Sequence, residues 1–373
     1  MRHVAFLVLL GSLVGCNTLR LGVPAPEAGE AVVAPPPLVE LWERNVEAAF
    51  GPAAPSVLGD QVLVSTRQGD LVLLNAATGQ VDGKQSFGDS VEGAVAFSDN
   101  RRLLFVGAAQ PGQVIAHDLT SGERAWRWRS RDLGTPDAGV VQSGGVVVAP
   151  LTDGTIVGLD AATGDMRWST RPDTTATYAA APVVYAGGVA LADDRGTVRL
   201  LDPQTGDRIW TVLVGGPVEH TPAMGADGTL FVPTTRGDMV QVREGGRIGW
   251  RVSFTDPADR VAPRTGPPVW HASGLVVAGA TNGRVQAIDA ASGAVRWTRD
   301  LDAHVNGTPL VSGGFVFVGT TDRRVLALDI QTGEPRWEAT VRGRVKSGLA
   351  AADGMLFVLT EPRHVVAFGP PAP

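Results

Sequence analysis

Five aspartates recur in the same local setting and are the first candidates for metal chemistry. Each stands four residues before a glycine and eight before a tryptophan, as in Asp-Ala-Ala-Thr-Gly-Asp-Met-Arg-Trp at residues 160–168. Calcium needs several oxygens that converge, whereas these aspartates fall in separate copies of one motif. The pattern therefore predicts turn capping and no metal site, since Asp accepts backbone N–H groups and Gly supplies the left-handed conformation. The five are Asp118, Asp160, Asp202, Asp289 and Asp329.

The histidines show no zinc-like pairing in the sequence; they stand at positions 3, 117, 220, 271, 304 and 364. His220 and His304 each lie shortly before a Thr-Pro dipeptide that opens a repeat, so both are expected to approach the centre of the fold. The sequence alone leaves open whether these histidines cluster in space. No G-x-S-x-G elbow, P-loop or H-E-x-x-H motif is present, and no catalytic residue and no cofactor are predicted.

Alternating tryptophan and arginine at residues 126–131 raise the question of nucleic-acid binding. On a strand, alternation places Trp126 on one face and Arg127, Arg129 and Arg131 on the other, and charges on an outer strand discourage edge-to-edge pairing. The chain has a formal net charge of -6 and a pI near 5.6. Nucleic acid is therefore not expected as a partner.

The Asp-to-Trp motif is one part of a longer repeat. Looser copies place Asn75 and Val242 at the Asp position, the second ending at Trp250, and consecutive anchors are 40 to 47 residues apart. Within one copy, strands are expected at residues 275–279 and 284–288 with turns between them, and Trp297 falls on a fourth strand. Four antiparallel strands per period of this length are typical of a β-propeller blade.

The tryptophans are interpreted as apolar plates wedged against the neighbouring blade, because one blade cannot bury both faces of its sheet. They are Trp126, Trp168, Trp210, Trp250, Trp297 and Trp337. The first blade lacks this residue: Gly83 stands in its place, with Phe87 as a substitute. The longest insertion between blades covers residues 255–265, and loops of this kind on a rigid scaffold commonly carry binding sites.

The two ends of the repeat array complete each other. Residues 38–45 predict an outer strand with Trp42 but no blade in front of it, whereas residues 346–369 predict three strands and stop before a Trp strand. The N-terminal strand is therefore expected to close the C-terminal blade. Seven anchors and this composite blade predict an all-β, eight-bladed propeller that forms a single domain over residues 38–373.

The N-terminus is expected to be a processing signal. Leu13-Val14-Gly15-Cys16 follows a short apolar run and resembles the lipobox of bacterial lipoproteins. The resemblance implies a signal peptide over residues 1–15 and acylation of Cys16, the only cysteine. Residues 16–37 then predict a Pro-rich, semi-extended tether. Asn17 after the cysteine implies, by resemblance to the sorting rule of enteric bacteria, delivery to the outer membrane with the domain facing the periplasm.

The Ala-x-Asp-x-x-Thr-Gly-x-x-x-Trp repeat, together with the lipobox and the tether, resembles the BamB family of pyrroloquinoline-quinone-type propellers. The resemblance implies a scaffold of the outer-membrane β-barrel assembly machinery. Its partners would be the POTRA domains of BamA, other machinery subunits and unfolded outer-membrane proteins. Two alternatives stay open: an anchored propeller that binds another envelope protein or glycan, and a quinone-dependent dehydrogenase.

The same resemblance implies a partner-binding surface on two loops near the middle of the chain, at residues 215–220 and 256–265. The implied contact residues are Val218, Glu219, His220, Asp256, Asp259, Arg260, Val261 and Arg264.

Overall fold

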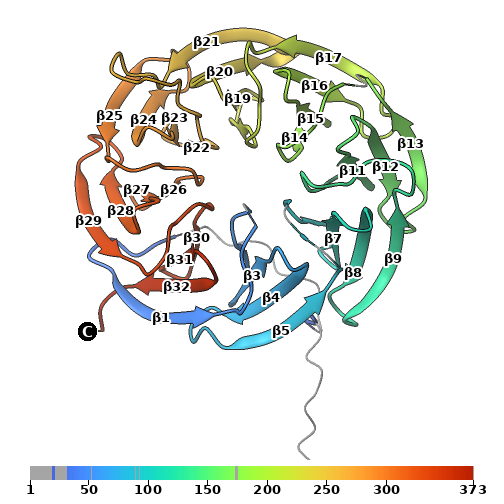
Figure 1. The fold of residues 1–373 in the computed structure, drawn as a ribbon, viewed down its shortest axis with the longest axis horizontal. Coiled ribbons are helices and arrows are strands. Elements are labelled where there is room, and N and C mark those ends of the chain that lie inside the picture. The colour runs from blue at the N-terminus through green and yellow to red at the C-terminus, as the bar shows by residue number, and fades with distance from the viewer. Residues whose placement is uncertain are drawn as a thin grey trace, which may run out of the picture.

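The computed structural model describes residues 19–21, 32–51, 53–88, 90–91, 93–172 and 175–372. Within these ranges the chain forms eight four-stranded antiparallel sheets arranged as the blades of a ring (Figure 1). The predicted eight-bladed propeller is therefore confirmed. The predicted signal peptide and Cys16 lie outside the described residues, as does residue 373. Among the described residues, no helix has the length and apolar character needed to cross a membrane.

The blades follow one another along the chain. Blade one comprises β2 (Ser56–Leu58), β3 (Gln61–Ser65), β4 (Asp70–Asn75) and β5 (Val81–Ser86), and blade two comprises β6 (Ala96–Phe97), β7 (Leu103–Ala108), β8 (Gln113–Asp118) and β9 (Glu123–Arg129). Blade three comprises β10 (Val141–Ser143), β11 (Val146–Pro150), β12 (Ile156–Asp160) and β13 (Met166–Thr170). Blade four comprises β14 (Val183–Tyr185), β15 (Gly188–Ala192), β16 (Thr197–Leu201) and β17 (Arg208–Leu213). Blade five comprises β18 (Ala223–Met224), β19 (Leu230–Pro233), β20 (Asp238–Arg243), the 3-10 turn η1 (Glu244–Gly246) and β21 (Arg247–Ser253). Blade six comprises β22 (Val269–His271), β23 (Leu275–Gly279), β24 (Arg284–Asp289) and β25 (Val295–Asp300). Blade seven comprises β26 (Leu310–Ser312), β27 (Phe315–Gly319), β28 (Arg324–Asp329) and β29 (Pro335–Thr340). The eighth blade comprises β30 (Ala350–Ala352), β31 (Met355–Thr360), β32 (His364–Gly369) and β1 (Val39–Asn45).

The composite eighth blade closes the ring. β1 pairs antiparallel with β32 from Val39 opposite Gly369 to Asn45 opposite His364. Figure 1 shows the blue strand β1 lying along the red strand β32 at the rim. The predicted closure by the N-terminal strand is confirmed.

The core lies between the blades. Middle strands such as β11 and β16 are buried along their whole length because a neighbouring blade covers each face. Each fourth strand instead alternates exposed and partly buried residues, as in β17. Eight apolar clusters result, one at each junction between adjacent blades.

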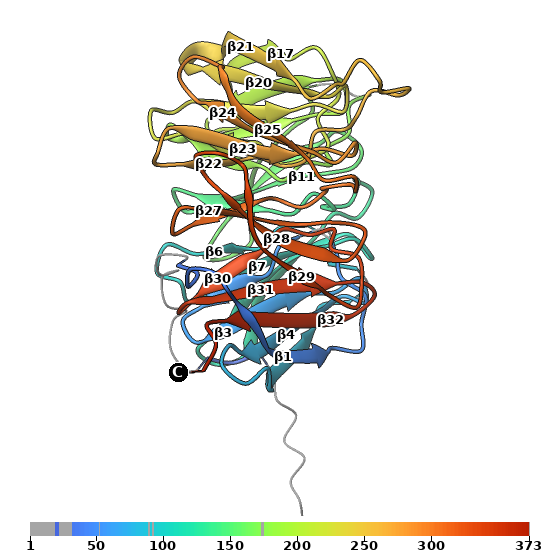
Figure 2. The same ribbon diagram turned by 90° about the vertical axis from the view of Figure 1, so that its left-hand side faces the viewer.

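The ring has two distinct faces. Because the strands of a blade alternate in direction, the turns between its third and fourth strands all lie on one face, which we call the turn face. The loops that join one blade to the next lie on the opposite face, the loop face. Figure 2, which views the ring edge-on, shows the loop between β21 and β22 standing out beyond its neighbours on the loop face.

The predicted tether is wrong for part of its length. Leu19 is fully buried and Leu21 packs beside it, in the apolar cluster between blades one and two. Val33 is 2% exposed and bridges to Gly354 of the eighth blade. Apolar side chains interspersed among prolines and alanines are enough to attach the segment to the ring. Residues 22–31 lie outside the described ranges.

Candidate functional site

The anchor aspartates cap the turns on the turn face. The Oδ1 atom of Asp160 accepts hydrogen bonds from the backbone N–H groups of Ala162 and Thr163, both at 2.9 Å, and Gly164 closes the turn at φ 79°. The pKa of the Asp160 carboxyl lies below its usual value, chiefly because Arg167 donates a hydrogen bond to it. Burial acts in the opposite direction. At Asp289, hydrogen bonds from the Ser292 hydroxyl and then Arg296 lower the pKa in the same direction.

The tryptophans join each of these turns to the preceding blade. Trp126 donates its Nε1–H to the carbonyl of Ala161 at 3.0 Å and lies over Gly164, where any Cβ atom would come within 2.6 Å of the ring. At five of the junctions the acceptor is the residue that follows the anchor. The same bond joins Trp42 to Ala76, Trp168 to Pro203, Trp250 to Ala290 and Trp297 to Ile330. Trp337 bonds to Leu38, and Trp210 lies over Gly246.

The two loops expected to bind a partner meet on the loop face. Arg264 Nη1 lies 2.8 Å from Glu219 Oε2, although the two residues belong to loops on either side of blade five. His220 follows directly, and burial is the main cause that lowers its pKa. The structure therefore brings Glu219, His220 and Arg264 together.

Two of the predicted contact residues hold the long loop in shape. Arg284 of β24 pairs with Asp256 at 2.5 Å, and Asn282 donates to Asp259 at 2.9 Å. A further bond joins the Asp256 N–H to Asp259 Oδ2 at 2.7 Å. Both carboxylates are therefore committed to the loop and to blade six.

The tip of the long loop points to solvent. Val261 is 81% exposed, the highest value among the exposed large apolar side chains of the described chain, and Arg260 beside it is exposed as well. Val218 is different: it is fully buried in the core between blades four and five. The prediction that Val218 contacts a partner is wrong, because its side chain completes that apolar cluster.

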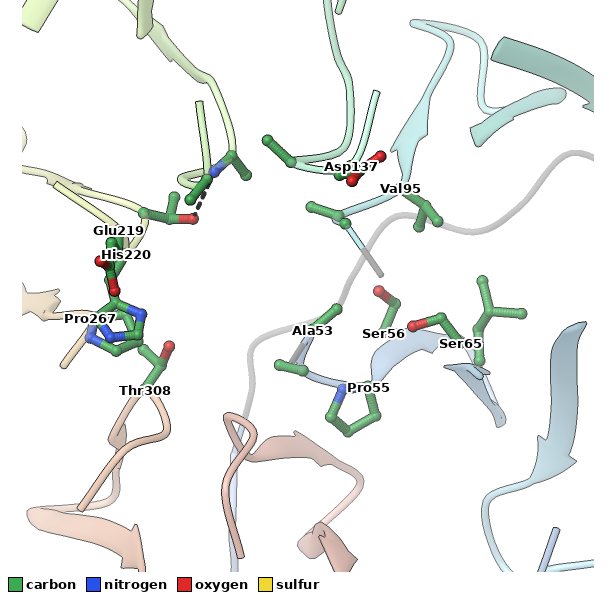
Figure 3. A pocket seen from close by; sticks show the side chains of 18 of the residues that line it. Ala53, Pro55, Ser56, Ser65, Val95, Asp137, Glu219, His220, Pro267 and Thr308 are labelled. Atoms are coloured by element: carbon green, nitrogen blue, oxygen red, sulfur yellow. Dashed lines mark hydrogen bonds between the residues drawn. The ribbon is translucent and has the colours of Figure 1, made fainter. Parts of the chain in front are cut away.

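Near the axis of the ring, a cavity of about 310 Å³ opens between the inner strands. Figure 3 shows Glu219, His220, Pro267 and Thr308 on one side of it, across from Ala53 and its neighbours. A second cavity, of about 390 Å³, shares Glu219 and His220 and is bordered by charged residues that sequence reasoning missed. These are Arg67, Lys346 and Glu361, which come from turns and loops of different blades and share no motif.

Metal-binding side chains do not gather in these cavities. Among the described residues, no group of three or more His, Cys, Asp or Glu side chains could hold a metal ion. The anchor aspartates stay in separate turns, and His304 does not line either cavity with His220. What converges near the axis is a polar, mostly small-residue surface suited to non-covalent contact.

Similarity to known proteins bears on this geometry. The family model described as outer membrane protein assembly factor BamB matches residues 39–192, 194–264, 243–338 and 281–370, which together span the ring. The chain belongs to the BamB family. No curated protein sequence matches it.

Solved structures share the fold of the family at low sequence identity. BamB from Moraxella catarrhalis is 20% identical, with a TM-score of 0.72 over 89% of this chain and 99% of that chain. A quinohemoprotein alcohol dehydrogenase from Comamonas testosteroni is 16% identical, with a TM-score of 0.73 over 89% of this chain and 76% of that chain. A europium-containing methanol dehydrogenase is 14% identical, with a TM-score of 0.74 over 89% and 93% of the two chains. These likenesses show the propeller fold alone.

Proposed function

We propose that this protein is a non-enzymatic scaffold of the outer-membrane β-barrel assembly machinery. In this proposal Cys16 carries a lipid anchor in the outer membrane, and the ring faces the periplasm and binds the POTRA domains of a BamA-like subunit. The family match along the whole ring is the observation that carries the proposal. The Leu-Val-Gly-Cys sequence at residues 13–16 supports the anchor.

The proposed contact surface is the loop-face patch formed by Glu219, His220, Arg260, Val261 and Arg264. Its long loop is held by Asp256 and Asp259, so little conformational entropy is lost when a partner binds. Val261 supplies an exposed apolar side chain and Arg260 a charge beside it. An apolar anchor with a polar surround is the usual composition of an interface centre.

A quinone enzyme fits the structure less well. The calcium that accompanies the quinone in such propellers requires several converging oxygen ligands. The described residues contain no such cluster, and of the two carboxylates that border the cavity shown in Figure 3, Asp137 and Glu219, the second is already paired with Arg264. The residues present do not fit the quinone and its metal, and no reaction step is proposed through them.

Purified POTRA domains provide the direct test of the contact surface. Replacing both tip residues, by Arg260→Glu and Val261→Asp, should weaken binding at least tenfold in biolayer interferometry, because the change removes an apolar anchor and reverses a charge. A matched control carries Arg208→Glu and Val295→Asp on the outer walls of blades four and six, where both residues are also exposed.

Two results would contradict the proposed surface. One is wild-type affinity in the tip variant, and the other is an equal loss in the control. Recovery of a different envelope protein in place of the POTRA domains would favour the alternative of a propeller with another partner.

A further inference from the structure

The junction between blades one and two differs from the others because its tryptophan is missing. Gly83 stands on β5 opposite Leu73, the position that Trp297 occupies opposite Ala287 in blade six. By the rule of the other junctions, the acceptor for the missing indole would be the carbonyl of Leu119, which follows the anchor Asp118. That carbonyl accepts a hydrogen bond from the backbone N–H of Leu21 at 2.8 Å.

Residues 19–21, which we call the docked segment, fill this place. Leu19 is fully buried among side chains of blades one and two, and its carbonyl lies 2.6 Å from Nε2 of the buried His117. Arg20 donates its Nε–H to the carbonyl of Thr120 at 3.1 Å. Three consecutive residues are thus fixed to the turn between β8 and β9, on the turn face.

The docked segment fixes the chain to the ring a short way after Cys16 in the sequence. Cys16 precedes Leu19 by three positions, and an extended chain covers at most about 3.6 Å per residue, so a lipid carried by Cys16 would be attached no more than roughly 11 Å of chain from the docked leucine. A lipid on Cys16 would therefore hold this rim of blade two at the membrane surface. A free tether over residues 16–37 would leave the orientation of the ring open.

Three unpaired arginines share this rim. On β9, Arg124, Arg127 and Arg129 stand opposite His117, Ile115 and Gln113 of β8. Residues directly opposite in a ladder share a face, and this is the face that blade two turns toward blade one. All three arginines are exposed, and within the described chain none forms an ion pair or hydrogen bond.

The missing tryptophan also leaves an open cleft beside these arginines. The cleft has a volume of about 320 Å³ and is bordered by Phe87, Gly122, Arg124 and Arg127. The three arginines lie on one face of β9, and repulsion from Arg129 is the main cause that lowers the pKa of Arg127.

Arginines on the other outer strands are mostly neutralised. Arg167, Arg296 and Arg336 each pair with the anchor aspartate of their own blade. In blade two, Ala125 stands at that position, and Arg102 pairs with Asp118 instead. Protection of a free sheet edge does not require three charges, since β13 and β29 carry fewer. The cluster therefore needs another explanation in a chain of net charge -6.

We propose that the outer wall of blade two is the membrane-facing surface of the protein, and that Arg124, Arg127 and Arg129 bind the phosphates of anionic lipid headgroups beside the docked segment. The inference rests on the proposed function in one respect, the lipid on Cys16. Guanidinium groups beside a lipid anchor can bind the headgroup phosphates, because they match the phosphate oxygens in charge and geometry. The loop face is then left free for a protein partner, because the docked segment is attached to the turn face.

Vesicle binding tests the arginines. The probe is the chain from residue 16 with Cys16→Ser, so that no acyl group dominates the affinity. With vesicles of phosphatidylethanolamine and phosphatidylglycerol, Arg124→Ser, Arg127→Ser and Arg129→Ser together should weaken binding about a hundredfold, since each basic residue near an anionic surface contributes about fivefold. The control carries Arg171→Ser, Arg208→Ser and Arg247→Ser, three exposed arginines of other blades, and should keep most of the binding.

Orientation on the membrane is measured with the acylated chain. A fluorophore on Glu123→Cys of blade two should be quenched by headgroup-labelled lipid, whereas one on Ala294→Cys of the opposite blade six should not. Gly83→Trp would displace the docked segment and should make the two labels equivalent. These results would support the proposal.

Three outcomes would overturn the proposal: wild-type vesicle affinity in the triple variant, an equal loss in the control, or stronger quenching at blade six. An intact-mass measurement of Cys16 tests the lipid separately. Failure of POTRA binding would leave the vesicle results standing, so the two proposals fail independently.

Discussion

Two junctions of the ring are closed by residues from the N-terminal part of the chain, and they are closed by different means. Between blades eight and one, β1 is a full strand of the sheet, and Trp42 on it lies over Gly79 and donates to the Ala76 carbonyl at 2.9 Å. Between blades one and two, the docked segment of three residues supplies a leucine side chain and a backbone N–H to the equivalent carbonyl, that of Leu119.

The difference concerns cooperativity. β1 pairs with β32 along its length, with one irregularity between Glu40 and Trp42, so its removal exposes the edge and the core of the eighth blade together. The docked segment touches the ring through one buried leucine and a few hydrogen bonds. Detachment of the docked segment is therefore expected to be a local event with a lower free energy than the unfolding of the ring.

The largest effect is expected from Trp42→Ala. The substitution removes an aromatic plate and its hydrogen bond from the closing junction, and should lower the free energy of unfolding by about 3 kcal/mol in urea denaturation. Trp42→Phe is the control, since it keeps the plate and loses only the bond, at about 1 kcal/mol. Equal unfolding midpoints for the wild type and Trp42→Ala would show that β1 does not close the ring cooperatively.

A smaller and local effect is expected from Leu19→Ala. Loss of a fully buried leucine should weaken docking by about 2 kcal/mol. Because docking is separate from ring folding, hydrogen exchange at Leu21 should accelerate roughly thirtyfold while the urea midpoint of the ring stays nearly constant. A midpoint shift as large as that of Trp42→Ala would remove the distinction between the two junctions.

Acid should destabilise the ring through the buried His117. Burial is the main cause that lowers the pKa of His117, partly offset by its bond to Leu19 and by the charge of Asp118. A lowered folded-state pKa means that the stabilisation is complete above the ordinary histidine value near 6.5 and is lost as pH falls through the lowered value. The free energy of unfolding of the ring, measured in urea, should therefore fall by up to about 1.4 kcal/mol per pH unit below pH 6.5.

His117→Gln is the control for this pH dependence, because its amide can still donate to the Leu19 carbonyl without titrating in that range. The same pH dependence of the free energy of unfolding in His117→Gln and in the wild type would contradict the assignment to His117.

The smallest effect is expected at the loop-face patch. Arg264→Gln breaks an exposed ion pair with Glu219, and such pairs contribute less than about 1 kcal/mol to folding. Unfolding in urea should be almost unchanged, while POTRA binding should weaken. A large loss of ring stability would assign Arg264 to the fold instead of the contact surface.

The repeat could be predicted from the sequence because the residues that shape each blade lie close together in the chain. The spacing of Asp160, Gly164 and Trp168 specifies a capped turn and an interblade plate, and both are where the spacing places them. Closure by Trp42 was also predictable, since an unpaired Trp strand at one end matched a missing strand at the other.

Other features depend on contacts between segments far apart in the chain. The prediction for Gly83 recorded the missing tryptophan, but Phe87 alone does not fill its place, and nothing local shows that Leu19 does. Val218 was assigned to the contact surface because the family resemblance places the loop at residues 215–220 there, whereas its side chain is buried between blades four and five. The cluster of unpaired arginines became visible only when the partners of the other arginines were known.

The most direct test of the proposed function is a pull-down of the tagged, acylated protein from solubilised native membranes, with mass spectrometry and an absorption spectrum of the eluate. We expect recovery of a POTRA-bearing barrel protein, no quinone absorption, and loss of that partner in the variant with Arg260→Glu and Val261→Asp. A quinone spectrum, or a set of partners that lacks any POTRA protein, would contradict it.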